Sequence, residues 1–110
     1  MPAAARVGDS VNTGHLCSTT TTIQQGDSTV LIGGRPAAYN GSLLSPHTIE
    51  SQRGVQPPGP PTNPSTCIPH TANVTAGSST VFVGGKQLAR RGDRADDGTI
   101  TGGADNVVVG

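Results

Sequence analysis

The chain has 110 residues, with seven basic and seven acidic side chains and no formal net charge. Apolar residues make up 32% and aromatic residues 2% of the chain, whereas it contains 16 glycines and nine prolines; a single small domain of this composition needs support beyond its hydrophobic core. Zero net charge argues against nucleic acid and anionic membranes as partners, because both attract basic surfaces.

The first segment, residues 2–9, reads Pro-Ala-Ala-Ala-Arg-Val-Gly-Asp. It lacks the charged start and the apolar stretch of a secretory signal. We therefore expect that, if the protein leaves the cell, it does so without the general secretion pathway. No apolar run in the chain approaches the roughly 20 residues of a membrane-spanning helix.

An internal repeat organises the rest of the chain. Each copy has a glycine, a small polar turn, three apolar positions and a second glycine, and the copies are residues 26–33, 77–84 and 103–110. Such β-branched runs bounded by glycine predict short strands and disfavour disorder. The first two copies continue into similar segments, at 34–42 and 85–93, and residues 2–9 supply the continuation that the last copy lacks. We predict an all-β fold of three strand-rich lobes around one axis, with the termini close together.

The segment 42–73 is longer than its counterparts and contains a proline-rich stretch at 56–64. Proline favours extended backbone and cannot donate to a sheet ladder. We interpret 42–73 as an insertion in the second lobe. A surface loop is the preferred interpretation of the stretch, and the alternative is a segment that packs across the apex and delivers metal ligands.

Four residues in the loops form a candidate metal site: His15, His47, Cys67 and His70. Three imidazoles and one thiolate complete a tetrahedral zinc set with no open position, so the site is expected to be structural rather than catalytic. These ligands favour Zn²⁺ over Ca²⁺ or Mg²⁺, whereas copper or iron remains an alternative. The third loop, at 93–99, is expected to contribute no ligand.

The two cysteines leave a choice. Cys17 lies two residues after His15 and competes for the fourth position, but Cys67 is favoured because Pro69 stiffens the Cys-x-x-His segment. A disulfide between Cys17 and Cys67 is the only pairing available. Without a signal peptide it is less favoured than one thiolate ligand and one spare thiol.

The N-terminal segment and the repeat resemble the PAAR-repeat proteins. The opening matches the Pro-Ala-Ala-Arg signature, and the family's recurring strand motif resembles residues 26–39 and 77–90, and in truncated form 103–110. The resemblance implies a single domain over 1–110, shaped as a small pseudo-threefold cone with short strands, long loops and a metal site near the apex. Many members of the family carry toxic effector extensions, and we expect none in this chain.

The resemblance also implies a function. The family caps the trimeric β-helical spike, VgrG-like or from a phage, of contractile injection machines such as type VI secretion systems and phage tails, and its sharp tip leads through the target membrane. One structural zinc near the tip would be held by His15, His47, Cys67 and His70. The expected state is a monomer on a trimer, in some systems with secreted effectors. It would be assembled in the bacterial cytoplasm and delivered outside the cell. The residues do not distinguish a phage from a secretion system.

Two other functions compete with this interpretation. A small zinc hydrolase would need a metal-bound water and a carboxylate base, and Glu50, three residues after His47, is the only glutamate. A stand-alone adhesin or binding module would need exposed aromatic side chains, and the chain has only Tyr39 and Phe82. We therefore expect a structural protein and no enzyme.

Overall fold

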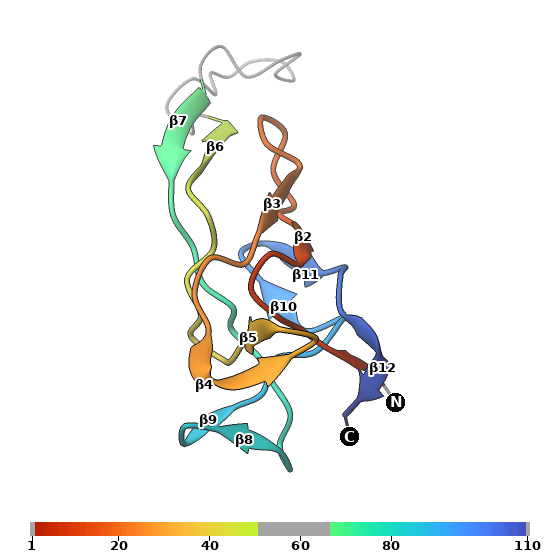
Figure 1. Ribbon diagram of the computed structural model, residues 1–110. Helices are drawn as coiled ribbons and strands as arrows, with labels where there is room; N and C mark the ends of the chain where they lie inside the picture. The colour runs from red at the N-terminus through yellow and green to blue at the C-terminus, as the bar shows by residue number, and fades with distance from the viewer. Residues whose placement is uncertain (1, 51–66, 110) are drawn as a thin grey trace.

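The computed structural model describes residues 2–50 and 67–109, and this part of the chain consists of short strands and loops without a helix. The body is elongated, with principal extents of 49, 23 and 22 Å. Figure 1 shows the hairpins β6–β7 and β8–β9 at opposite ends of the long axis. None of the described residues forms a helix long and apolar enough to cross a membrane.

The strands are short and mostly paired in antiparallel hairpins. In chain order they are β1 (Ala3–Ala4), β2 (Ser10–Asn12), β3 (Thr20–Thr22), β4 (Asp27–Ile32), β5 (Arg35–Ala37), β6 (His47–Glu50), β7 (Cys67–His70), β8 (Phe82–Val83), β9 (Lys86–Gln87), β10 (Arg94–Ala95), β11 (Gly98–Ile100) and β12 (Ala104–Val108). The largest sheet has the order β10-β11-β2-β3, and the others are the pairs β1-β12, β4-β5, β6-β7 and β8-β9.

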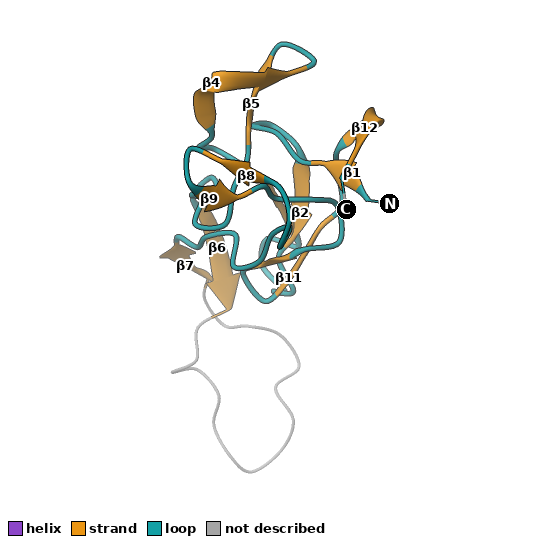
Figure 2. Ribbon diagram, turned by 90° about the horizontal axis from the view of Figure 1, so that it is seen from below, coloured by secondary structure: helices purple, strands orange, loops and turns teal. Residues whose placement is uncertain are grey.

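Three of these hairpins are the three copies of the repeat. They are β4–β5, β8–β9 and β1–β12, and seen from below they lie on different sides of the body (Figure 2). The third hairpin joins the two ends of the chain: Ala3 pairs with Val108, and the Val109 N–H donates to the Pro2 carbonyl at 2.8 Å. This confirms that the N-terminus completes the last unit.

The turns of the first two hairpins explain their paired glycines. Gly33 and Gly34 have φ of 61° and 82°, and Gly84 and Gly85 have φ of 56° and 81°. Two-residue hairpin turns with positive φ at both positions match the twist of the strands they join, and glycine adopts them without steric cost.

A closed ring of backbone hydrogen bonds joins the three lobes at the axis. The Ala5 N–H donates to the Ala89 carbonyl (3.0 Å), the Ala89 N–H to the Ala38 carbonyl (2.9 Å), and the Ala38 N–H to the Ala5 carbonyl (3.0 Å). All three alanines are fully buried. Each lobe therefore donates one hydrogen bond and accepts one in the ring. Because the three backbones meet here and the alanines are fully buried, we expect a side chain larger than methyl to fit poorly.

The small apolar core is built mostly from sets of three equivalent residues, one from each lobe. One cluster contains Ala5, Ala38 and Ala89, then Val11, Leu44 and Ala95, then Ile23, Val74 and Ile100. The second contains Ala4, Ala37 and Leu88, then Ile32, Val83 and Val109, with Ala104. All three lobes therefore share a core made of small and medium-sized side chains, which explains how a chain with so few large apolar residues folds.

In each lobe the chain leaves the axis through the same four-residue turn, here called the corner: residues 6–9, 39–42 and 90–93. The backbone N–H of one residue donates to the side chain three positions later, in the pairs Arg6–Asp9 (2.7 Å), Tyr39–Ser42 (2.9 Å) and Arg90–Asp93 (2.9 Å). In two corners the arginine side chain also donates to the same carboxylate. The hydrogen bond to Asp9 raises the pKa of Arg6. In the second corner Ser42 keeps the backbone contact, so Tyr39 replaces the signature arginine without loss of the corner.

The apolar strand runs divide their residues between the core and solvent. Ile32, Val83 and Val109 are buried, whereas the preceding residues, Leu31, Phe82 and Val108, are more than half exposed. The all-β class is confirmed. The insertion expected at 42–73 contains the hairpin β6–β7, and its proline-rich stretch at 56–64 lies outside the described residues.

The alanine ring predicts that a larger side chain on the axis is poorly tolerated. We expect Ala38→Val to lower the free energy of unfolding by about 1–3 kcal/mol, because two extra methyl groups must displace the other two lobes. Urea denaturation measures the change. The exposed control Thr101→Val should stay within about 0.5 kcal/mol of the wild type. Equal stability of both variants would show that the ring is not tightly packed.

Candidate metal centre

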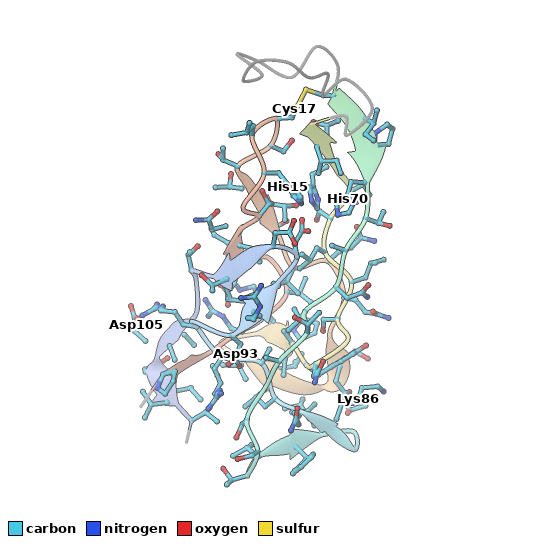
Figure 3. The ribbon with its side chains drawn as sticks, turned by 180° about the vertical axis from the view of Figure 1, so that it is seen from behind. His15, Cys17, His70, Lys86, Asp93 and Asp105 are labelled. Atoms are coloured by element: carbon cyan, nitrogen blue, oxygen red, sulfur yellow. A yellow bond between two sulfur atoms is a disulfide. The ribbon has the colours of Figure 1, made fainter. Side chains whose placement is uncertain are left out.

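The candidate site lies beyond the core, where three loops meet. They are the described parts of residues 9–22 in the first lobe, 42–73 in the second and 93–99 in the third. His15 follows β2 in the first lobe, His47 begins β6 and His70 ends β7 in the second, and Asp96 lies in the turn between β10 and β11 of the third. Figure 3 shows the side chains of His15 and His70 close together. The register pairs His47 directly with His70 across that hairpin.

The three histidine rings form one cluster. The ring centroids of His15 and His70 are 5.3 Å apart, those of His47 and His70 are 5.1 Å apart, and those of His15 and His47 are 6.3 Å apart. The side chains of His15 and His47 are almost fully buried, whereas that of His70 is 28% exposed. The expectation that the three histidines converge from distant parts of the chain therefore agrees with the structure; whether they bind metal stays a prediction.

Asp96 lies at the centre of this cluster. Its Oδ1 is 3.0 Å from His15 Nε2 and 3.3 Å from His70 Nε2, and its Oδ2 is 2.8 Å from His47 Nε2. The Asp96 side chain is only 5% exposed. Donor atoms of His15, His70 and Asp96 lie within 4.8 Å of one another, so these residues form a group able to hold a metal ion.

Both ring nitrogens of His47 have a neighbouring oxygen atom, and this limits which charge states of the cluster are favourable. Its Nδ1 is 2.9 Å from the Ser45 carbonyl oxygen, and its Nε2 faces the Asp96 carboxylate. A neutral imidazole has one N–H; if this N–H donates to Ser45, a lone pair on Nε2 faces a carboxylate oxygen. A protonated ring or a shared cation resolves that conflict. The Nε2 atoms of His15 and His70 lie against the same carboxylate, so one cation could be shared by all four groups, and the donor set fits a metal.

The pKa of Asp96 is lowered in the folded chain. Burial alone raises it, but hydrogen bonds from His15, His47 and His70, with the nearby charge of His15, lower it by more. The carboxylate is therefore kept ionised, which is the state in which it binds a cation.

The expectation for Cys67 is corrected by the structure. Its sulfur forms a disulfide with Cys17, and the described residues contain no free cysteine. The segment Cys67–His70 is a strand, not a tight turn. Residues three apart on a strand point to opposite faces and lie about 10 Å apart along it. Cys67 and His70 therefore do not face one site, and the pairing we considered less favoured is the one present.

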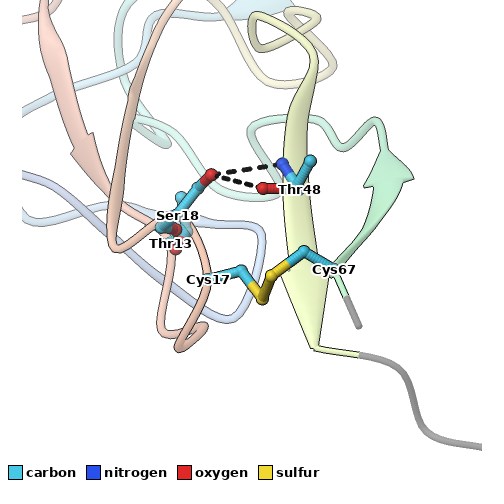
Figure 4. Close-up of a disulfide and its surroundings, with 5 residues drawn as sticks. All are labelled: Thr13, Cys17, Ser18, Thr48 and Cys67. Carbon is cyan, nitrogen blue, oxygen red and sulfur yellow. Dashed lines mark hydrogen bonds between the residues drawn. A yellow bond between two sulfur atoms is a disulfide. The ribbon is translucent and has the colours of Figure 1, made fainter. Parts of the chain in front are cut away.

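The disulfide fastens the loop of the first lobe to the hairpin β6–β7. Beside it, Ser18 Oγ lies 2.9 Å from Thr48 Oγ1 and accepts a hydrogen bond from the Thr48 N–H at 3.2 Å (Figure 4). Thr48 and Cys67 share the face of the hairpin opposite to the histidines. The fully buried Thr13 orders the same loop, since its hydroxyl donates to the Ser18 carbonyl and accepts from the His15 N–H.

The third loop was expected to contribute no ligand, so sequence reasoning missed Asp96, whose carboxylate faces the three histidines. The repeat contained a signal that could have pointed to this position. Asp96 lies four residues before Ile100, as His70 lies four residues before Val74, and both apolar residues belong to one core triad. Glu50, considered as a catalytic base, pairs with Cys67 at the far end of β6. Its backbone is about 10 Å along the strand from His47.

Comparison with known families gives one match. A family model described as the PAAR motif matches residues 2–45, the segment that spans the first lobe with its His15 loop. This motif is associated with spike-tip proteins of contractile injection systems, and the family is structural rather than enzymatic. A comparison with curated proteins gave no match.

The disulfide predicts a measurable share of the stability. Cys17 and Cys67 are 50 residues apart, and loop-closure entropy for such a link corresponds to about 4 kcal/mol. We expect the double variant Cys17→Ser, Cys67→Ser to lose roughly 2–5 kcal/mol of unfolding free energy, measured by urea denaturation of chelator-treated protein. An unchanged denaturation midpoint would mean that the link does not form in solution.

Proposed function

Because the chain is a PAAR-repeat protein, we propose that it forms the membrane-piercing tip of a contractile injection machine and caps a trimeric β-helical spike. Association with a spike protein follows from the family; the trimer and the docking face are the proposal. We place its assembly in the bacterial cytoplasm and its delivery outside the cell, as part of the particle.

The observation that carries the docking proposal is a threefold set of exposed apolar side chains. Leu31, Phe82 and Val108 occupy the same position in the three repeats and are 58%, 57% and 54% exposed. Val30, Val81 and Val107, one position earlier, are 37%, 38% and 36% exposed. Exposed large apolar side chains that gather into a patch mark interaction sites, and here the repeat supplies two such side chains from each lobe.

The symmetry of this set identifies the kind of partner it fits. One chain with three similar lobes presents three similar contacts, so it matches a threefold axis without needing three copies of itself. A trimer with a flat apolar end would cover the three exposed positions at once. The chain's zero net charge is consistent with docking that depends on apolar contact more than on charge.

The other end of the body has the properties of a tip. The apolar clusters lie in the body, whereas the region of β6 and β7 is held by the histidine–aspartate cluster and the disulfide. A closed structural zinc site contributes about 10 kcal/mol of folding free energy where packing cannot. We propose one structural zinc held by His15, His47 and His70, since imidazole suits zinc and disfavours calcium or magnesium.

The docking surface yields a direct test. We expect Leu31→Asp, Phe82→Asp and Val108→Asp each to weaken binding to a purified trimeric β-helical spike protein at least about tenfold, because each buries a charge in an apolar contact. Native mass spectrometry and biolayer interferometry measure the binding. The matched control is Leu16→Asp, an exposed leucine next to Cys17, which should bind like the wild type.

Two results would refute the docking face. One is unchanged spike binding by all three variants, provided that thermal melts show them folded. The other is loss of binding by the Leu16→Asp control, which would place the contact at the opposite end.

A further inference from the structure

We infer that Asp96 is the fourth ligand of the metal centre, completing a set of three imidazoles and one carboxylate in which Cys67 takes no part. The inference rests on the proposed function only in assuming that the histidine cluster binds a transition metal. It names a residue from the third lobe, so that each of the three lobes contributes to the site. Zinc, or cobalt in its place, is the class of ion expected.

The contacts of Asp96 distinguish it from every other donor near the cluster. Its two oxygens meet all three histidine Nε2 atoms at 2.8–3.3 Å. In a tetrahedral zinc site with bonds of about 2.0–2.2 Å, neighbouring donor atoms lie roughly 3.3–3.6 Å apart. The distances from the carboxylate to the imidazoles therefore differ from this spacing by about half an ångström or less. His15, His70 and Asp96 already form a group within 4.8 Å, and His47, which lies outside that group, has to move inward to bind the same ion.

The backbone at Asp96 is compatible with this role. Among the described residues, Asp96 is the only non-glycine residue with positive φ, at 56°. It is the first residue of a two-residue hairpin turn, a place that glycine usually fills when φ is positive. Aspartate is one of the few other residues that adopt this conformation readily, so the turn can present a carboxylate to the cluster.

Neighbouring lobes hold this turn in place. The Asp96 N–H donates to the Asn73 carbonyl of the second lobe at 3.2 Å, and the Asp97 N–H donates to the Thr13 carbonyl of the first lobe at 3.1 Å. The turn is thereby fixed between the strand that leads from His70 and the loop that carries His15. The carboxylate is positioned before any ion binds, which lowers the entropic cost of binding.

The competing donors are less well placed. Asp97 has a carboxylate 3.4 Å from His15 Nε2, but its side chain is 70% exposed. Cys67 is bonded to Cys17 and lies on the opposite face of β7 from His70. The metal and the disulfide are therefore two separate fastenings of the tip. The carboxylate ligand, unlike a thiolate, cannot be lost to oxidation.

Cobalt(II) titration of the full chain, stripped of metal with a chelator, tests the assignment. Cobalt in a tetrahedral site gives intense visible bands, and a thiolate ligand adds a charge-transfer band in the near ultraviolet. We expect one cobalt per chain, with the tetrahedral bands present and the thiolate band absent. The spectrum of the unaltered protein needs no variant to fold.

Three variants complete the experiment. Asp96→Asn, which tolerates the positive φ equally well, should weaken cobalt and zinc binding at least about tenfold, given that even indirect partners of ligands contribute roughly 10–100-fold. The matched control Asp97→Asn should change the affinity less than threefold. The double variant Cys17→Ser, Cys67→Ser should keep one metal per chain and the same spectrum.

A thiolate band in the wild type, or loss of the metal in the double cysteine variant, would overturn the assignment in favour of Cys67. Unchanged affinity in Asp96→Asn, equal losses in both aspartate variants, or no cobalt binding by the wild type would overturn it as well. None of these results touches the docking face, because spike binding is measured separately on residues at the other end. The two proposals therefore fail independently.

Discussion

The ring of hydrogen bonds among Ala5, Ala38 and Ala89 is the constraint on which the rest of the structure depends. Each peptide group in it belongs to a different lobe, so closing the ring brings three distant parts of the chain to one axis. Only small side chains fit at this point. The ring therefore explains why a protein with so little apolar area repeats alanine where its lobes meet, and the rest of the core likewise draws on equivalent residues of every lobe.

Once the axis is closed, the loops can differ without disturbing the core. The first loop carries His15 and Cys17, the second is enlarged and carries His47, Cys67 and His70, and the third is a tight turn with Asp96. Neither apolar cluster contains a described residue of 12–22, 45–50 or 67–71. Polar and covalent links replace apolar packing there, in the form of the histidine–aspartate cluster and the disulfide. The end with the three repeat hairpins is symmetric, as docking on a symmetric partner requires. The end with β6 and β7 is asymmetric and is cross-linked, as a rigid tip requires.

Much of this arrangement could be predicted from the sequence. The glycine-bounded strand repeat predicts three lobes, the closure of the chain ends and the convergence of three histidines, because each lobe's loop leaves on the same side. The repeat alone did not reveal the alanine ring, since a closed hydrogen-bond cycle depends on register. It also left open which residue of each strand run faces solvent. Leu31 and Ile32 are both apolar, and only the pleat of β4 separates them.

The fourth donor could not be assigned from spacing. Cys-x-x-His brings two ligands together in a turn but separates them on a strand, and Pro69 does not reveal which conformation holds. Pairing with Thr48 places Pro69 within a two-stranded hairpin, where a missing N–H is tolerated. Asp96 has no local motif, because aspartate is common in turns for other reasons. Only its position relative to Ile100 in the repeat marks it.

The central claim is that one pseudo-threefold chain caps one threefold spike. Native mass spectrometry of the chain, mixed in increasing excess with a purified trimeric β-helical spike protein, tests it most directly. The account predicts a complex of one chain per trimer that does not change as the excess rises. Three chains per trimer, or no complex with any such trimer, would contradict it.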